Sequence, residues 1–204
     1  MNKKKHLYYR FKGFYPIVID IETSGLDSNI NAILEIALIT FKIDKNGWLK
    51  KDQIIHFHIK PFLNSKINYE SLIHNKININ SSLRGAISEY NAFNKIIKLI
   101  TKKMKKNLCN RSIIVAHNVV FDHNFIMSSI ERLGITINPF HPFTTFDTST
   151  ISSFIIGQNI LFKACKKIGL YFNMKYSHSA LYDSLLTASL FCKLINKFKF
   201  KKKK

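Results

Sequence analysis

Two carboxylates, Asp20 and Glu22, interrupt an otherwise apolar segment, YPIVIDIETSGL at residues 15–26. The alternating pattern of this segment predicts a strand with at least one buried face. Residues two apart in a strand point to the same side of a sheet, so both carboxylates would share one face. Burying a charge is costly unless it is paired or bound to a metal. The pair is therefore a candidate metal or catalytic site, although a surface acidic pair would show the same pattern.

Three other segments place acids or a histidine where they can do chemistry. AHNVVFDHNF puts Asp122 just inside a predicted helix that follows a buried strand, and SHSALYDSLLTA puts His178 five residues before Asp183. FDTS puts Asp147 at a strand end, where we interpret it as the cap of the next helix. Taken singly, Asp122 suits any helix N-terminus and His178 any polar surface, so only the whole set indicates a site.

Carboxylates that converge on one point repel one another, and bound divalent cations would offset that repulsion. Oxygen ligands suit Mg²⁺ or Mn²⁺. Two such ions about 4 Å apart can stabilise the attacking and leaving oxygens of a phosphodiester displacement. A histidine titrates near neutral pH, so His178 could accept a proton from the attacking water. In this interpretation Asp20 would bridge the two ions.

Three motifs together resemble the DEDD exonuclease superfamily, in the branch whose general base is a histidine. They are VIDIETSGL at 18–26, VAHNVVFDHNFI at 115–126 and HSALYDSLLTA at 178–188. A wider pattern, which includes RFKGFYPIVIDIET, HFHIKPF, RGAISEY, CNRSIIVAHN and NPFHPFTTFDT, is similar to the ribonuclease T family from about residue 8 to 198. Proofreading exonuclease subunits and oligoribonucleases share the three motifs without this wider pattern.

The resemblance implies an activity and a set of site residues. The expected enzyme is a Mg²⁺-dependent 3′→5′ exoribonuclease with two ions per site, with Mn²⁺ as an alternative. It would trim the 3′ ends of tRNA and other stable RNAs, release nucleoside 5′-monophosphates, act also on single-stranded DNA, and form a homodimer. The implied metal ligands are Asp20, Glu22, Asp122 and Asp183, and the implied general base is His178.

Further residues are implied to hold the nucleic acid. Phe121 and Phe143 match aromatic positions that stack on the last bases, although both could instead pack in the core. Glu70 matches a residue that hydrogen-bonds the terminal base. Leu26 and His74 depart from the family, whose better-known members have Phe there. Because Leu has no π-face, discrimination among 3′-terminal bases is expected to be weaker in this chain.

The charge of the chain favours a polyanionic partner. Lys and Arg number 32 against 12 Asp and Glu, which gives a net charge of +20. Codon bias in an AT-rich genome offers an alternative origin for many of the lysines, including those of the tail at 199–204. By resemblance, Arg10, Lys12 and Arg111 belong to a patch that holds RNA through its phosphates.

The order of elements predicts an α/β fold. Three consecutive strands are expected to pair antiparallel, and alternating helices and strands follow, which gives a mixed sheet with helices on both faces. This agrees with the ribonuclease H-like fold that the resemblance implies. We expect one exonuclease domain over 1–198 and a flexible basic tail over 199–204. The expected strands are 14–21, 32–43, 53–62, 111–117 and one ending at 144–148, and the expected helices are 84–107, 121–134 and 180–198.

The sequence shows no recognisable signal peptide or membrane span, and we therefore expect a cytoplasmic protein. The N-terminal apolar run ends at Asp20, too soon for a signal peptide, and no apolar stretch is long enough for a membrane span. The three cysteines are widely spaced, which suits a reduced compartment. Two alternatives to a stable-RNA trimming enzyme are a DNA-proofreading exonuclease subunit and an RNA-binding module with a decayed site.

Overall fold

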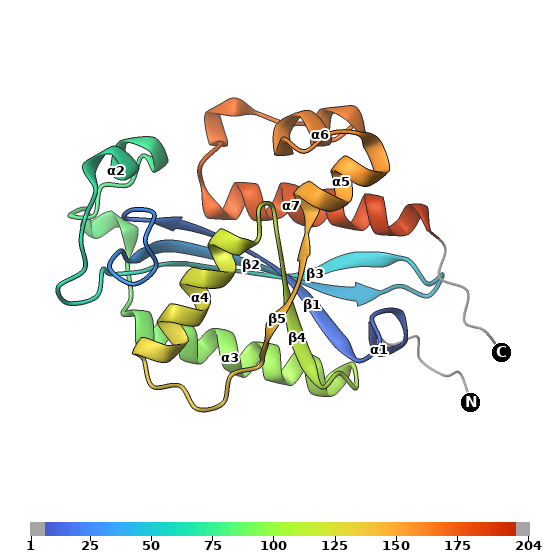
Figure 1. Cartoon of the computed structure of the whole chain (residues 1–204), viewed down its shortest axis with the longest axis horizontal. Helices are drawn as coiled ribbons and strands as arrows, with labels where there is room; N and C mark the ends of the chain where they lie inside the picture. Colours follow the sequence, from blue (N-terminus) through green and yellow to red (C-terminus); the bar gives the residue numbers. More distant parts are fainter. Residues whose placement is uncertain (1–6, 199–204) are drawn as a thin grey trace.

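The structure, a computed structural model, describes residues 7–198. Its centre is a five-stranded mixed sheet with the order β3-β2-β1-β4-β5 (Figure 1). The strands β1, β2 and β3 pair antiparallel, and β4 and β5 run parallel to β1. This is the predicted ribonuclease H-like arrangement. The strands are β1 (Phe14–Thr23), β2 (Ile33–Ile43), β3 (Leu49–His58), β4 (Arg111–Ala116) and β5 (Phe140–Asp147).

The third strand starts and ends four residues earlier than predicted. The reason is a tight turn, in which Asp44 Oδ1 accepts hydrogen bonds from the backbone N–H groups of Asn46 and Trp48, both at 2.9 Å. Leu49 therefore pairs with Ile43 immediately after the turn. The hairpin itself, with Asn-Gly at its tip, was predicted correctly.

The long predicted helices α3, α4 and α7 are confirmed, with α3 starting at Glu89. The side chain of Ser88 accepts a hydrogen bond from the N–H of Asn91, which fixes that start. The short helices α1, α2 and α6 lack a clear periodic pattern and were not predicted. The helices are α1 (Leu7–Arg10), α2 (Tyr69–Asn75), α3 (Glu89–Lys106), α4 (Val120–Arg132), α5 (Thr148–Ile156), α6 (Leu161–Lys167) and α7 (Ala180–Lys197), with 3₁₀ turns at Ser82–Arg84 and Met174–Tyr176.

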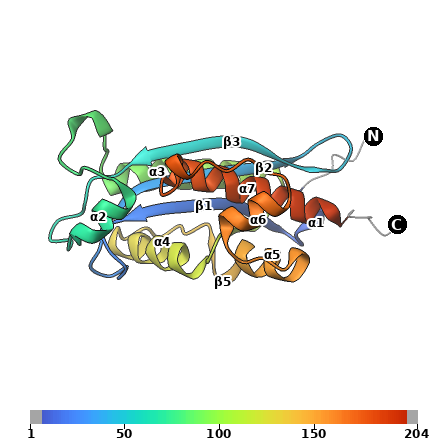
Figure 2. The same ribbon diagram turned by 90° about the horizontal axis from the view of Figure 1, so that it is seen from above.

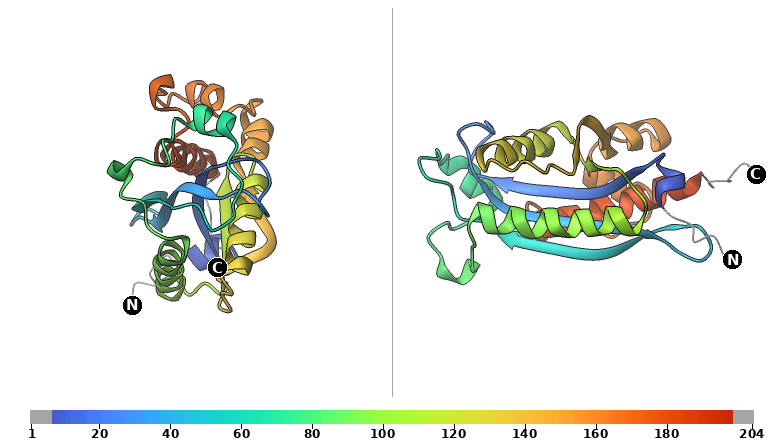
Figure 3. Two further views of the ribbon diagram at one scale, coloured as in Figure 1. Left: turned by 90° about the vertical axis from the view of Figure 1, so that its left-hand side faces the viewer. Right: turned by 90° about the horizontal axis from the view of Figure 1, so that it is seen from below.

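The sheet lies between two helical layers. Helix α3 covers one face and α7 the opposite face, where α5 and α6 pack further out (Figures 1 and 3). Both faces of β1 are buried, so Ile17, Val18 and Ile19 are inaccessible to solvent. Phe93 of α3 and Phe191 of α7 complete the core on the two sides. A strand buried on both faces is rigid, and it makes a firm support for polar groups at its end.

One end of the sheet gathers the polar motifs. The end of β1, the start of α7 and the helix α2 lie together there (Figures 1 and 2). Within residues 7–198, none of the helices is sufficiently long and apolar to span a membrane. The predicted basic tail, 199–204, lies outside the described residues.

Candidate active site

Three of the predicted metal ligands meet at the end of β1. Asp20 and Glu22 project from the strand, and Asp183 comes from the first turn of α7. One carboxylate oxygen from each lies within 4.8 Å of those of the other two. The rigid strand supplies the pair, and the helix N-terminus brings the third acid to it, as the sequence motifs predict.

Asp122, the fourth predicted ligand, lies beside this group. It occupies the first turn of α4 and is only 5% exposed. Its carboxylate accepts a hydrogen bond from the backbone N–H of Ile21, between the two acids of β1. Its charge also helps to raise the pKa of Asp20, so the four acids form one electrostatic unit.

Burial raises the pKa of every acid in this unit, and neighbouring carboxylates raise it further. Burial, followed by the charges of Glu35, Asp183 and Asp122, raises the pKa of Glu22 to about 8. Burial also raises the pKa of Asp122 to about 8 and that of Asp183 to about 6. The pKa of Asp20 is raised well above its usual value by burial and then by Asp122. Binding a cation would therefore expel protons, and metal affinity would rise with pH.

The donor set fits hard divalent cations. All four side chains offer carboxylate oxygens, which Mg²⁺ and Mn²⁺ prefer to sulfur or nitrogen. Burial, and then the neighbouring carboxylates, raise the pKa values of Asp20 and Glu22, and a bound cation would offset both effects. Asp20, Glu22, Asp122 and Asp183 would hold the ions.

His178 lies at the edge of the carboxylates on an unusual backbone. Its φ is +64°, and its N–H donates to Asp183 Oδ2 at 3.0 Å. Its ring lies against that of His74, with 3.9 Å between the centroids. Burial lowers the pKa of His178, and the positive potentials of His74 and Lys76 lower it further. The ring is therefore neutral, as a proton acceptor must be, at physiological pH.

A cavity of about 500 Å³ opens beside the carboxylates. Its lining includes Glu22, Leu26, Glu70, His74 and Phe121, which come from the end of β1, its following loop, α2 and α4. The sequence analysis placed all five in the site, and the structure brings them to one space. The volume lies within the range of typical small-ligand pockets and suits a nucleotide.

The two predicted stacking residues differ in their surroundings. Phe143 is 87% exposed on β5, which excludes a core role. Phe121 is half-buried, with its ring 4.9 Å from that of Phe125, so it both packs on the core and lines the cavity. Phe143 does not line this cavity and lies outside it.

The predicted basic residues lie at the other end of β1. Lys12 precedes the strand, and Arg111 begins β4 opposite Phe14. Six residues of strand separate Phe14 from Asp20, a span of about 20 Å. The Arg10 guanidinium donates to the backbone carbonyls of Ile195 at 2.6 Å and Phe198 at 3.2 Å. Arg10 thus has a structural role at the end of α7, which sequence reasoning did not foresee.

Asp147 is confirmed as a helix cap. Its Oδ1 accepts from the N–H of Ser149 at 2.9 Å, at the start of α5. The same oxygen accepts from the N–H of Asn118 at 2.9 Å, in the turn before α4. Asp147 therefore joins two turns, and its charge only modulates Asp122.

Sequence reasoning missed Glu35, a buried acid on β2. It pairs directly with Glu22 in the register of the two strands. Its carboxylate contacts His56 of β3 and the start of α7. The only available signal was a single charge within the apolar run AILEIALITF, which a surface-facing residue would also give.

Comparison with known proteins identifies the family. The chain matches the RNase_T family, described as Exonuclease, over residues 17–191. Ribonuclease T of Buchnera aphidicola subsp. Schizaphis graminum is 55% identical over 190 residues, which cover 93% of this chain and 87% of that protein. Ribonuclease T of Klebsiella pneumoniae subsp. pneumoniae is 50% identical, over 93% of this chain and 88% of that protein.

Solved structures share the fold at low identity. The nuclease domain of 3′hExo, a DEDDh family member bound to rAMP, has a TM-score of 0.70 at 14% identity, covering 90% of this chain and 92% of that chain. Exonuclease I of E. coli in complex with dT13 has a TM-score of 0.64 at 16% identity and is covered over only 40% of its length. Family membership and the carboxylate cluster together indicate dependence on a divalent metal. The chain belongs to the ribonuclease T family and is a hydrolase of the 3′→5′ exoribonuclease class.

Proposed function

We propose that this enzyme trims the 3′ ends of tRNA and other stable RNAs by a two-metal hydrolysis that uses Mg²⁺. The observation that carries the proposal is the group of oxygen donors from Asp20, Glu22 and Asp183, with Asp122 beside it. Single-stranded DNA is a second substrate, because base stacking does not depend on the sugar. Mn²⁺ would support the same chemistry.

Each site residue has a defined task in this proposal. When bound, the cations lower the pKa of the attacking water and neutralise charge on the phosphate. The neutral ring of His178 accepts a proton from that water, and the released product is a nucleoside 5′-monophosphate. Asp20, Glu22, Asp122 and Asp183 keep the reacting groups in place. Titration of these acids makes metal binding weaker as pH falls.

The cavity would hold the 3′-terminal base. The half-buried ring of Phe121 offers a stacking surface, and Glu70 of α2 offers a hydrogen-bond acceptor. His74 presents a smaller π-face where a larger aromatic ring would stack better. Leu26 is 82% exposed at the rim, and its side chain has no π-face to offer.

Leu26→Phe is expected to tighten binding of a single-stranded 3′ end. One added base stack contributes about 1–3 kcal/mol, so affinity should rise by about 5-fold or more. Discrimination among terminal bases should sharpen too. The measurement compares binding and trimming rates of oligonucleotides that differ only in the last two nucleotides. Leu83→Phe is the matched control, because Leu83 is 96% exposed and lies outside this cavity. Equal effects of both variants would remove residue 26 from the base-binding site.

The proposal and its two alternatives predict different results with a tRNA that carries extra 3′ nucleotides. A tRNA with extra 3′ nucleotides should be shortened to a defined end in Mg²⁺. A DNA-proofreading subunit would instead prefer mismatched DNA ends and would require a polymerase partner. A decayed RNA-binding module would bind the tRNA and release no nucleotide. The complete set of four acids and His178 favours the active enzyme.

We further propose that the enzyme is a homodimer in the cytoplasm. Lys12 and Arg111 lie about 20 Å from Asp20 along β1, at the opposite end of the strand from the site of their own subunit. A two-fold partner would turn its basic patch toward that site. The three cysteines are free thiols in the described chain, consistent with a reduced compartment.

Mixed dimers are expected to regain activity. One variant carries Asp122→Asn, and the other carries Lys12→Glu with Arg111→Glu, which leaves the structural contacts of Arg10 intact. Each should trim RNA poorly alone. Random exchange should make about half of the dimers mixed, each with one intact patch facing one intact site.

Activity of the mixture should then exceed the mean of the separate samples. Lys102→Glu with Lys105→Glu is the matched charge control, because these exposed lysines lie on α3. If native mass spectrometry detects mixed dimers and activity still equals the mean, the patch does not serve the partner site.

A further inference from the structure

Glu35 is a buried acid that is not among the proposed metal ligands, although its charge contributes to the raised pKa of Glu22. It is 4% exposed, on β2 directly opposite Glu22. Hydrogen bonds lower its pKa despite the opposing effect of burial, so Glu35 is an anion in the folded chain. A buried anion is tolerated where donors compensate it, and the partners of Glu35 therefore indicate its purpose.

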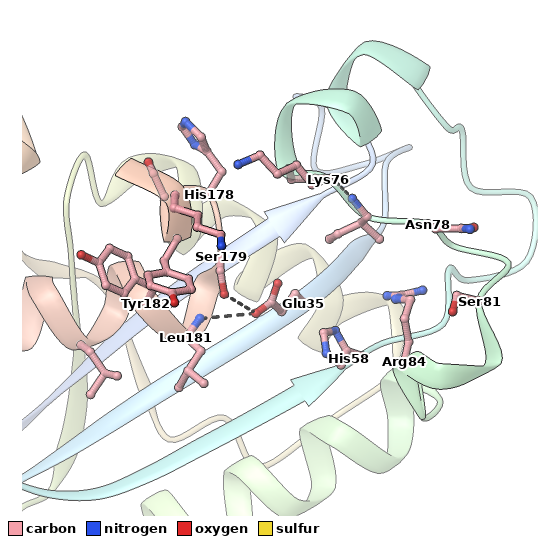
Figure 4. Close-up of a pocket in the computed structure, with 16 residues that line it drawn as sticks. Glu35, His58, Lys76, Asn78, Ser81, Arg84, His178, Ser179, Leu181 and Tyr182 are labelled. Atoms are coloured by element: carbon pink, nitrogen blue, oxygen red, sulfur yellow. Dashed lines mark hydrogen bonds between the residues drawn. The ribbon is translucent and has the colours of Figure 1, made fainter. Parts of the chain in front are cut away.

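A single oxygen of Glu35 accepts three hydrogen bonds. His56 of β3 donates from Nε2 at 2.8 Å, the Ser179 hydroxyl donates at 3.2 Å, and the Leu181 N–H donates at 3.4 Å. The carboxylate thereby joins β2, β3 and the start of α7 at one point. Figure 4 shows the bonds from Ser179 and Leu181 to Glu35.

The two donors from α7 lie next to the proposed base. Ser179 follows His178 directly, and the Asp183 N–H donates to the Ser179 carbonyl at 2.9 Å. The ring of His178 points away from Glu35 in Figure 4, so the two side chains do not interact directly. Any influence of Glu35 on His178 must pass through the backbone of Ser179.

The backbone of His178 needs such support. A φ of +64° is unfavourable for a residue other than glycine, by about 1–3 kcal/mol, and persists only where neighbouring contacts hold it. The His178 N–H bond to Asp183 holds one side of this residue. The bonds from Glu35 hold the other side, at Ser179 and Leu181.

We propose that Glu35 is a positioning residue that fixes the loop of His178, through Ser179, against the sheet that carries Asp20 and Glu22. This inference rests on the proposed role of His178 as general base. Glu35, His58, His178 and Ser179 line a cavity of about 600 Å³ beside this loop (Figure 4). The bonds from Ser179 and Leu181 to Glu35, together with the His178 N–H bond to Asp183, are contacts that hold this loop in place.

A competing role for Glu35 is metal binding together with His56 and His58. Their ligand atoms lie within 4.8 Å of one another, and His58 Nδ1 is buried without a hydrogen-bond partner. Two features favour positioning. The Oε1 oxygen of Glu35 already accepts hydrogen bonds from three donors. The Arg84 guanidinium also adds positive charge near His58.

Two substitutions at Glu35 separate these roles. Glu35→Gln keeps an oxygen that can accept all three hydrogen bonds and removes the charge that a metal would need. Glu35→Ala removes the acceptor altogether. Positioning predicts a kcat within about 3-fold of the parent for Glu35→Gln, and a loss of about 10- to 100-fold for Glu35→Ala, with KM little changed. If Glu35→Gln loses as much activity as Glu35→Ala, the charge matters and positioning is overturned.

Glu89→Ala is the matched control for stability. Glu89, the first residue of α3, is also a buried acid, 6% exposed, and it accepts hydrogen bonds from Ser129 and Arg132 of α4. Both alanine variants should unfold at lower temperature, but only Glu35→Ala should lower kcat of the folded enzyme. Ser179→Ala removes one donor and keeps the acid, so it tests the same contact if Glu35→Ala does not fold. It should lower kcat less than Glu35→Ala does.

A double-mutant cycle identifies the route. In the His178→Ala background, Glu35→Ala should cost less than about 3-fold in kcat, because the residue that it positions is already gone. If Glu35→Ala lowers kcat as much in that background as it does in the parent enzyme, the inference is overturned. Full activity of His178→Ala itself would instead refute the proposed base, and impaired His178→Ala with fully active Glu35→Ala would refute the positioning role alone.

Discussion

Asp122→Asn is expected to abolish RNA cleavage while single-strand binding persists. The neutral amide of Asn is a weaker ligand for a divalent cation than a carboxylate, and metal catalysis contributes several kcal/mol of transition-state stabilisation. The rate should therefore fall by about 1,000-fold or more. Binding should survive because the aromatic cavity and the basic residues supply most of the affinity. The measurement compares nucleotide release with oligonucleotide binding at the same Mg²⁺ concentration.

The matched control is Asp147→Asn. This neighbouring acid caps α5, and an amide oxygen caps a helix nearly as well as a carboxylate. The control should keep near-parental activity. Substantial cleavage by Asp122→Asn, or equal losses in both variants, would remove Asp122 from the proposed metal site.

His178→Ala is expected to slow cleavage by about 100- to 10,000-fold at neutral pH, the usual contribution of a general base. The lowered pKa of His178 keeps its ring neutral there, so the parent enzyme already has its base. The variant lacks this base, and its cleavage rate should rise with pH as hydroxide replaces the lost proton acceptor. A pH–rate profile of single-turnover cleavage tests this.

Added imidazole should restore part of the lost rate, because it can occupy the space left by the ring. Asp20, Glu22 and Asp183 remain in this variant, so Mg²⁺ binding should be nearly unchanged. A variant with parental activity at neutral pH would show that another group accepts the proton.

The sequence predicted the parts of this protein that depend on local pattern. β1 with Asp20 and Glu22 is recognisable because charges are rare within an apolar strand. The helices that contain Asp122 and Asp183 begin after a buried strand or a loop segment. Each has an acid in its first turn, where the helix dipole favours negative charge. The order of strands and long helices then limits the topology to a mixed sheet.

Tertiary contacts determine the features that the sequence did not reveal. Glu35 is a single acid in a strand, and only the approach of α7 gives its carboxylate two of its donors. Arg10 resembles any basic surface residue until the end of α7 packs against it. The start of β3 depends on a turn whose side-chain hydrogen bonds shortened the loop. None of these contacts produces a periodic pattern in the sequence from which it could be predicted.

The most direct test of the central claim follows a 5′-labelled single-stranded RNA through digestion. The account predicts a ladder that shortens from the 3′ end in Mg²⁺, stops when a chelator is added, and resumes when Mg²⁺ is restored. Nucleoside 5′-monophosphates should accumulate as the product, and Asp20→Asn should yield neither the ladder nor the nucleotides. Cleavage that continues in the chelator, or robust cleavage by Asp20→Asn, would contradict a two-metal exonuclease built on the acids at the end of β1.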